Sequence, residues 1–478
     1  MKSLAVAAAL GLALVALGNV FPDEGWYLYA GRRVADGAMP YRDFAHFQAP
    51  LSPYVFALAD GDRTTGRLIC LACGLGAIAL ALDVARGRST RAHTAAALML
   101  VPASYTLRWY AVCRNIAPAA LLLALGVWLA ERRGRPAAAA VALALAGGVR
   151  LSAAGAVPAL AAALALAGRR KDAARALLAG AVSLAAIFAP FALAAPRAFV
   201  FDNLLYHVGL HREGTWLEEV QGKALGVVKL GEHHQALVLG LLLTLWRRKE
   251  KEAGGTGQGA GGKWEGGRME VAGAVALAVT LLHLVPGRLH TEYHELVVPL
   301  LAVVAGSACA PLVERFAALS VPARAGVALL LTAQVFGAYG QLYPQTGWSP
   351  AMVADVSAAL ARTAPDGEPV VTFVPDFALE ADLPLADGLE MASVSLAIPS
   401  TTEDDCARLH VVTLATLARD LARRVPGAVV WRSLDDADPR RTSLYEPRDV
   451  QALDAALRAN YTPVVTVHGW TIWRRSPA

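Results

Sequence analysis

Two adjacent carboxylates, Asp23 and Glu24, follow directly on an apolar N-terminal run in the stretch NVFPDEGWYLYAGRRVADG. A carboxylate next to an apolar groove can accept the proton of a hydroxyl group as that hydroxyl attacks, which is general-base catalysis. The same residues could instead begin a helix, with Asp23 as the N-cap and Glu24 favourable to the helix dipole. Capping does not account for the neighbouring His46, Gln48 and aromatic side chains such as Tyr27, and these favour a chemical role.

A second candidate is Arg150, which stands between two apolar runs in LAGGVRLSAAGAVP. A guanidinium at such a position is costly unless it is paired or hydrated. The Arg150 side chain could extend so that its guanidinium reaches the membrane surface. Alternatively, the guanidinium could bind a phosphate group through two parallel hydrogen bonds. Arg108 and Arg114, in SYTLRWYAVCRN, are similar candidates for a phosphate contact.

Two histidines, His207 and His211, are spaced so that they would lie on one face of a helix. This spacing can bind a metal ion, but no third ligand is evident, so polar contacts to a substrate or lipid headgroup are the preferred interpretation. The short loop HLVPGRLHTEYHELVVP contains more polar residues than a turn needs, and Arg288, Tyr293 and His294 are its candidate contacts. The zinc-binding pattern H-E-x-x-H is absent from this loop.

The elements that would hold these residues are mostly apolar helices. The chain has 478 residues, 56% of them hydrophobic and 17% charged, and its mean hydropathy is +0.43. Runs of roughly 20 apolar residues predict about eleven membrane spans. Every second loop is rich in Lys and Arg, which by the positive-inside rule places the intervening loops on the outer face. These outer loops, at 22–65, 108–114, about 195–225 and 287–294, contain most of the candidate residues.

Other features limit the classes of function. The net charge is +5, but no basic stripe is interleaved with aromatic residues, so nucleic acid is not an expected partner. Cys70 and Cys73 form a C-x-x-C within an apolar run, which favours two small packing residues over a redox or metal pair. The first apolar run predicts a retained helix, and a signal peptide cleaved before Asn19 is the alternative.

The composition changes after the last apolar run. EPVVTFVPDF and PGAVVWRS predict strands, and DCARLHVVTLATLARDLARR and DVQALDAALRANY predict helices. TPVVTVHGWTIWRR predicts a terminal hairpin. We therefore expect a small extracytoplasmic α/β domain over 344–478 and a membrane domain over 1–343. The chain has neither a G-x-G-x-x-G after a strand nor a P-loop, so no nucleotide site is predicted.

The stretch PDEGWYLYAGRRVADGAMPYRDFAHFQAPLSPY, taken with the many apolar runs and the C-terminal α/β segment, resembles the GT-C membrane glycosyltransferases. The resemblance is greatest to the branch of aminoarabinose transferases and protein O-mannosyltransferases. It implies a polytopic α-helical fold and an inverting transfer of a sugar from a polyprenyl-phosphate donor to a cell-envelope acceptor, at the outer face of a bacterial plasma membrane. It also implies Asp23 as the catalytic base, with Glu24 as its partner or as the alternate base.

The resemblance further implies that basic residues of the outer loops contact the lipid phosphate. Arg150 is the best match by position. In the family the loop residue before a Pro-Leu step often contacts phosphate too, which makes His46 and Gln48 candidates. Where many relatives read Pro-Pro-Leu, this chain has Ala49-Pro50-Leu51. The candidates for sugar or acceptor binding are Tyr27, His207, His211, Arg288, Tyr293 and His294.

No cofactor is required by this interpretation, although a divalent cation is an option. Two other functions are the alternatives, namely a lipid-linked sugar transporter or flippase and a non-catalytic envelope-assembly protein. A transporter would need ionisable residues in the middle of its spans and broken helices at the midplane. The apolar runs here are mostly Ala, Leu and Val, with polar groups at their outer ends, which disfavours transport.

Overall fold

The computed structural model describes residues 2–209, 216–252, 270–284, 290–318, 320–336, 348–396, 402–432 and 447–477. They divide into two compact units. The helical unit takes its described residues from Met1–Leu17, Arg67–Phe188 and His211–Leu342. The mixed unit takes its residues from Gly18–Gly66, Ala189–Leu210 and Tyr343–Ala478. The first predicted outer loop thus groups with the C-terminal part of the chain.

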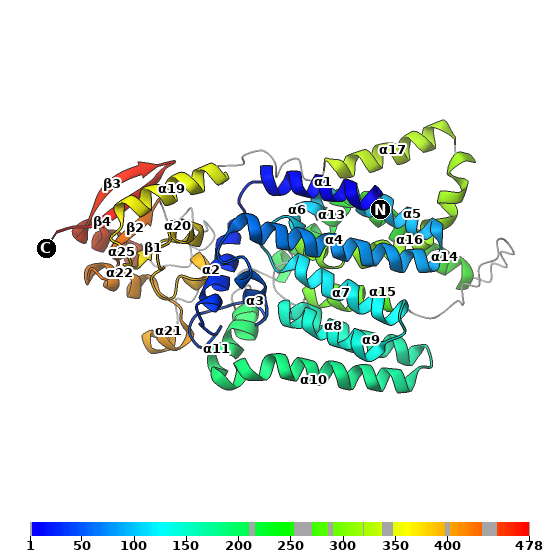
Figure 1. The fold of residues 1–478 in the computed structure, drawn as a ribbon, viewed down its shortest axis with the longest axis horizontal. Coiled ribbons are helices and arrows are strands. Elements are labelled where there is room, and N and C mark those ends of the chain that lie inside the picture. Colours follow the sequence, from blue (N-terminus) through cyan, green and yellow to red (C-terminus); the bar gives the residue numbers. More distant parts are fainter. Residues whose placement is uncertain are drawn as a thin grey trace. The chain divides into compact units, whose positions relative to one another are not determined.

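The helical unit is built from segments rich in Ala and Leu. Both residues have high helix propensity, and a helix satisfies its own backbone hydrogen bonds in an apolar environment. Figure 1 shows these helices in chain order from blue to green. They are α1 (Lys2–Leu17), α4 (Arg63–Arg88), α5 (Thr90–Leu100), α6 (Ser104–Tyr110), α7 (Ile116–Glu131), α8 (Pro136–Val149), η1 (Leu151–Gly155), α9 (Ala156–Leu166), α10 (Arg170–Ala194), α13 (Trp216–His233), α14 (Gln235–Glu252), α15 (Val271–His283), η3 (Thr291–Leu296), α16 (Val298–Arg315), η4 (Phe316–Ala318) and α17 (Val321–Val335).

Three of the described helices, α4, α10 and α16, are long and apolar enough to cross a membrane. A further group of apolar helices has 10–17 residues each, which is short for a perpendicular span of about 20 residues. The count of about eleven spans therefore stays a prediction. The helices α7, α8, α9 and α15 pack side by side (Figure 1), and their ends carry several of the candidate residues.

The mixed unit combines short helices with one sheet. Its elements are α2 (Glu24–Ala35), α3 (Ser52–Ala57), α11 (Pro196–Val200), the π-helix η2 (Phe201–Leu205), α12 (Tyr206–Gly209), α19 (Pro350–Thr363), β1 (Val370–Val371), α20 (Pro375–Glu380), η5 (Ala392–Leu396), α21 (Glu403–Leu409), α22 (Leu414–Ala422), β2 (Ala428–Trp431), α25 (Pro447–Asn460), β3 (Tyr461–Val467) and β4 (Trp470–Arg475).

The four-stranded sheet has the order β1-β2-β4-β3. Strands β1 and β2 are parallel, whereas β4 is antiparallel to both β2 and β3. The terminal hairpin turns at His468 and Gly469, whose φ angles are 49° and 82°. Two successive positive φ angles fit the twist of a two-residue hairpin, and Gly adopts such an angle without a steric penalty. The HG dipeptide in the predicted hairpin is therefore the turn that the structure uses.

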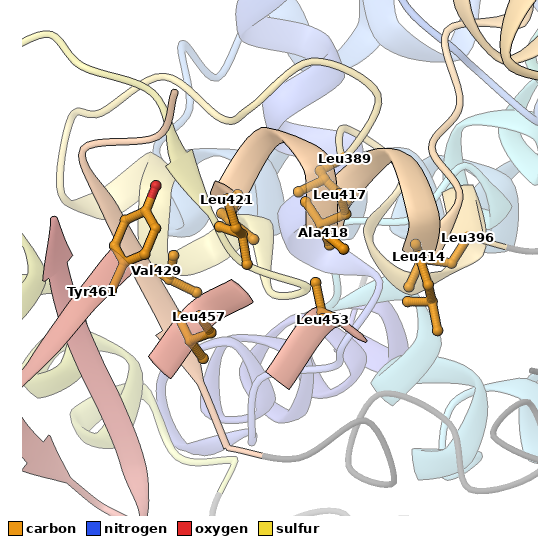
Figure 2. Packing of buried hydrophobic residues seen from close by; sticks show 11 residues of the cluster. Leu389, Leu396, Leu414, Leu417, Ala418, Leu421, Val429, Leu453, Leu457 and Tyr461 are labelled. Carbon is orange, nitrogen blue, oxygen red and sulfur yellow. The ribbon is translucent and has the colours of Figure 1, made fainter. Parts of the chain in front are cut away.

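A hydrophobic cluster packs α22 and α25 beside this sheet (Figure 2). On α22, Leu414, Leu417 and Leu421 recur at helical spacing and are buried. Leu453 and Leu457 of α25 complete the contact in the same way. A residue three or four positions along a helix returns to the same face, so this spacing gives each helix one apolar side.

Candidate functional site

The Asp-Glu pair stands at the start of α2 in the mixed unit. Asp23 occupies the N-cap position with helical φ and ψ of −82° and −15°, and its side chain makes no capping hydrogen bond. The carboxylate of Glu24 instead accepts a hydrogen bond from the Phe21 N–H at 2.8 Å. Glu24 is completely buried, while Asp23 is partly exposed. The capping interpretation of Asp23 thus gains no support, and Glu24 is the residue that fixes the start of the helix.

His46 lies in a buried hydrogen-bond network of the mixed unit. Its Nε2 is 2.9 Å from the Ser52 hydroxyl, and its backbone N–H donates to the Asp202 carboxylate at 2.8 Å. Burial lowers the pKa of His46 to about 3, so its imidazole is neutral at physiological pH. Gln48 accepts a hydrogen bond from the Tyr41 hydroxyl through its backbone oxygen at 2.6 Å. Phosphate binding by His46 and Gln48 stays a prediction, in which His46 would act as a neutral group.

Two further candidates of the mixed unit also sit among aromatic side chains. The ring of Tyr27 is buried, with centroid distances of 5.1 Å to Trp26 and 5.3 Å to Phe56. The Nε2 atom of His207 lies 3.0 Å from the backbone oxygen of Phe47. Both residues are held in place within this unit, and their contacts to sugar or acceptor stay predictions.

In the helical unit, Arg150 stands between α8 and η1 and is only 7% exposed. Its Nη1 donates to the side-chain oxygen of Asn115 at 2.7 Å, and the amide of Asn115 donates to the Val149 backbone oxygen at 3.2 Å. The guanidinium carbon lies 4.4 Å from the centroid of the Tyr293 ring. Among the described residues Arg150 has no carboxylate partner within ion-pair distance, and its Nε has no hydrogen-bond partner. It therefore keeps a buried positive charge that the described part of the chain does not neutralise.

Arg114 is also buried, but it is paired. Its Nη1 lies 2.9 Å from the Glu292 carboxylate, and its guanidinium carbon lies 5.2 Å from the Trp109 ring. Burial alone would raise the pKa of Glu292, yet the Arg114 guanidinium beside it holds that pKa below its ordinary value. Glu292 is thus the ionised partner of Arg114. Arg108, on α6, is likewise buried.

A histidine borders the ring of Tyr293. The ring centroid of His283, at the end of α15, is 5.3 Å from that of Tyr293, and the Nε2 of His283 is 2.7 Å from the Ser152 hydroxyl. His294, on η3, is 3% exposed, and burial lowers the pKa of its imidazole. Arg150, Tyr293 and His283 thus form one polar group at the ends of α8 and α15.

Two candidates, His211 and Arg288, lie outside the described residues. Sequence reasoning did not single out Asn115, Ser152 or His283. Each of the three lies beside a residue or an apolar run that the sequence had indicated. Asn115 follows Arg114, Ser152 is two residues beyond Arg150, and His283 ends an apolar run. Polar residues at the ends of apolar runs were the signal that could have identified them. Among the described residues, no group of three or more His, Cys, Asp or Glu side chains could hold a metal ion.

No model of a known protein family matches the chain, and no curated protein does. Solved structures do match, and they have the fold of the GT-C membrane glycosyltransferases. ArnT from Cupriavidus metallidurans bound to undecaprenyl phosphate aligns with a TM-score of 0.62 at 16% identity, over 100% of this chain and 99% of that one. ArnT in the apo state gives a TM-score of 0.61 at 17% identity, over 100% and 98%.

An oligosaccharyltransferase from Archaeoglobus fulgidus, in a complex with Zn and sulfate, is a third similar structure. It aligns with a TM-score of 0.58 at 13% identity, over 99% of this chain and 73% of that one. The chain therefore has the polytopic helical GT-C membrane fold that its sequence resemblance predicts.

Proposed function

We propose that the chain is an inverting glycosyltransferase that moves a sugar from a polyprenyl-phosphate donor to a cell-envelope acceptor at the outer face of a bacterial plasma membrane. The observation that best supports this proposal is the buried guanidinium of Arg150, whose contacts in the described residues are neutral. Because a guanidinium cannot lose its proton and a buried unpaired charge is costly, an anion is expected beside it. ArnT, which has the same fold, was solved with undecaprenyl phosphate bound.

On the donor side, Arg150 stabilises the phosphate group as it leaves. The Asn115 side chain fixes one nitrogen of the guanidinium, which leaves other N–H groups of Arg150 to bind phosphate oxygens. Groups that are held in place before the reaction stabilise developing charge without reorganising. Arg114 shares its charge with Glu292 and therefore contributes less to the binding of the anion.

On the acceptor side, the Asp23 carboxylate takes the proton of the acceptor hydroxyl. The hydroxyl oxygen then forms a bond to the anomeric carbon, and the bond from that carbon to the phosphate oxygen breaks. The phosphate leaves with the electron pair, and the configuration at the anomeric carbon is inverted. We prefer Asp23 over Glu24 as the base because Asp23 is partly exposed, whereas Glu24 is buried and already accepts the Phe21 N–H.

Replacement of Asp23 tests this function. Asp23→Asn keeps the size of the side chain and removes the base, so we expect transfer from a polyprenyl-phosphate-linked sugar to fall by roughly 10²–10⁴-fold. Binding of the lipid phosphate itself should be retained. Asp36→Asn, at the exposed C-terminal end of the same helix, is the matched control and should leave the rate unchanged. A rate near that of the wild type for Asp23→Asn would contradict the assignment of the base.

A further inference from the structure

A cluster of charges surrounds Arg63, which lies in the mixed unit because the first residues of α4, up to Gly66, belong to that unit. Arg63 is the first residue of α4, where the positive end of the helix dipole disfavours a cation. Its Nη2 lies 2.7 Å from the Asp376 carboxylate, and its Nη1 lies 2.7 Å from that of Glu380. The Arg63 side chain is 11% exposed and that of Asp376 is fully buried. Two carboxylates of α20 thus hold both terminal nitrogens of one guanidinium, a geometry that suits a planar fork of donors.

Asp376 also packs directly against α2. A Cβ atom placed on Gly25 would lie 2.1 Å from Oδ2 of Asp376 and 2.6 Å from its backbone nitrogen. Real side chains do not approach so closely, so only glycine permits α2 to lie against α20 at this position. Gly25 is separated from Asp23 only by Glu24, so the contact occurs in the first turn of the helix.

Glu24 connects the charge cluster to the start of α2. Its buried carboxylate lies within electrostatic reach of Arg63, and it accepts the Phe21 N–H just ahead of the helix. Further along α2, the Tyr29 hydroxyl accepts a hydrogen bond from the Leu385 N–H at 2.9 Å. The segment that includes α20 and Leu385 therefore contacts α2 at its first turn and again one turn later.

We infer that Asp376 is a positioning residue for the catalytic carboxylate: it holds Arg63, the positive charge of Arg63 attracts the Glu24 carboxylate, and Glu24 fixes the turn that presents Asp23. This inference rests on the proposed function and deepens it. The C-terminal part of the chain is then a component of the catalytic apparatus, which no feature of its sequence indicated.

The test compares Asp376→Asn with Asp382→Asn in the purified full chain. Asp382 forms an exposed ion pair with Arg32 of α2 at 2.6 Å, so it joins the same two parts of the chain without burial. For Asp376→Asn we expect kcat with a polyprenyl-phosphate-linked sugar to fall about tenfold or more, since a misplaced catalytic group costs up to about 10²-fold. KM for that donor and the binding capacity for undecaprenyl phosphate should stay within about twofold of the wild type. Asp382→Asn should change none of these quantities.

If Asp376 only stabilised the fold, part of the Asp376→Asn protein would be unfolded. Its kcat and its binding capacity would then fall together. That pattern, or a wild-type kcat in Asp376→Asn, would overturn the inference.

Hydrogen exchange of the α2 amides supplies a readout that needs no activity. Faster exchange over Glu24–Ala35 in Asp376→Asn but not in Asp382→Asn is expected, and equal exchange in both variants would overturn the inference. An inactive wild-type enzyme with this exchange pattern would contradict only the proposed function.

Discussion

Arg63 of the mixed unit and Arg150 of the helical unit both have largely buried side chains, but their surroundings differ. Arg63 has two carboxylates at 2.7 Å. Arg150 has an amide oxygen and a tyrosine ring, and no carboxylate within ion-pair distance in the described residues. Where the chain supplies the counter-charge, the cation needs no anion from a ligand. Where it does not, the missing anion is expected to come from a ligand, and this difference supports Arg150 as the phosphate site.

The largest effect on stability is expected from removing the guanidinium of Arg63, which two carboxylates bind. Arg63→Met leaves the fully buried Asp376 without its partner, which typically costs about 3–5 kcal/mol. For a unit of this size we expect the unfolding midpoint to fall by on the order of 10 °C, as measured by tryptophan fluorescence at pH 8.

The matched change in the helical unit should behave differently. Arg150→Met removes a charge that has no carboxylate partner in the described residues, so the unfolding midpoint should stay within a few degrees of the wild type or rise. An equal loss of stability in both variants would show that Arg150 is a structural residue and would remove the contrast between the two sites.

A smaller effect is expected at Glu390, a buried carboxyl group in the mixed unit. Burial raises its pKa to about 7, and its Oε2 has no hydrogen-bond partner in the described residues. Unlike Arg150, this group can become neutral. Because the folded state binds more protons than the unfolded state between roughly pH 4.5 and 7, stability falls by about 3 kcal/mol as the pH rises through that window. It then stays level above pH 7.

Unfolding midpoints at pH 5 and pH 8 check this pH dependence. Glu390→Gln cannot take up a proton at this position, so we expect the variant to lose less stability than the wild type over that interval. Equal losses in the two proteins would show that Glu390 does not carry the effect.

The sequence alone predicted the apolar helices and the terminal hairpin, because each is encoded in a short local pattern. It did not predict the Arg63–Asp376 ion pair, whose members are 313 residues apart. A charge in a loop does not reveal its partner when many other charged residues could serve. Nor did it predict that Arg114 is neutralised by Glu292 while Arg150 is not, since both arginines stand at the ends of apolar runs. Only folded geometry separates the paired cation from the unpaired one.

Binding of undecaprenyl phosphate to the purified chain tests the role of Arg150 directly, with Arg150→Gln compared against Arg133→Gln. Arg133 is exposed in the same unit and packs over the Trp128 ring, so its replacement is the control. Loss of a buried charge contact costs about 2–5 kcal/mol, so Arg150→Gln should weaken binding by roughly 30-fold or more, while Arg133→Gln binds like the wild type. Equal affinities in all three proteins would show that Arg150 does not bind the phosphate of the lipid donor.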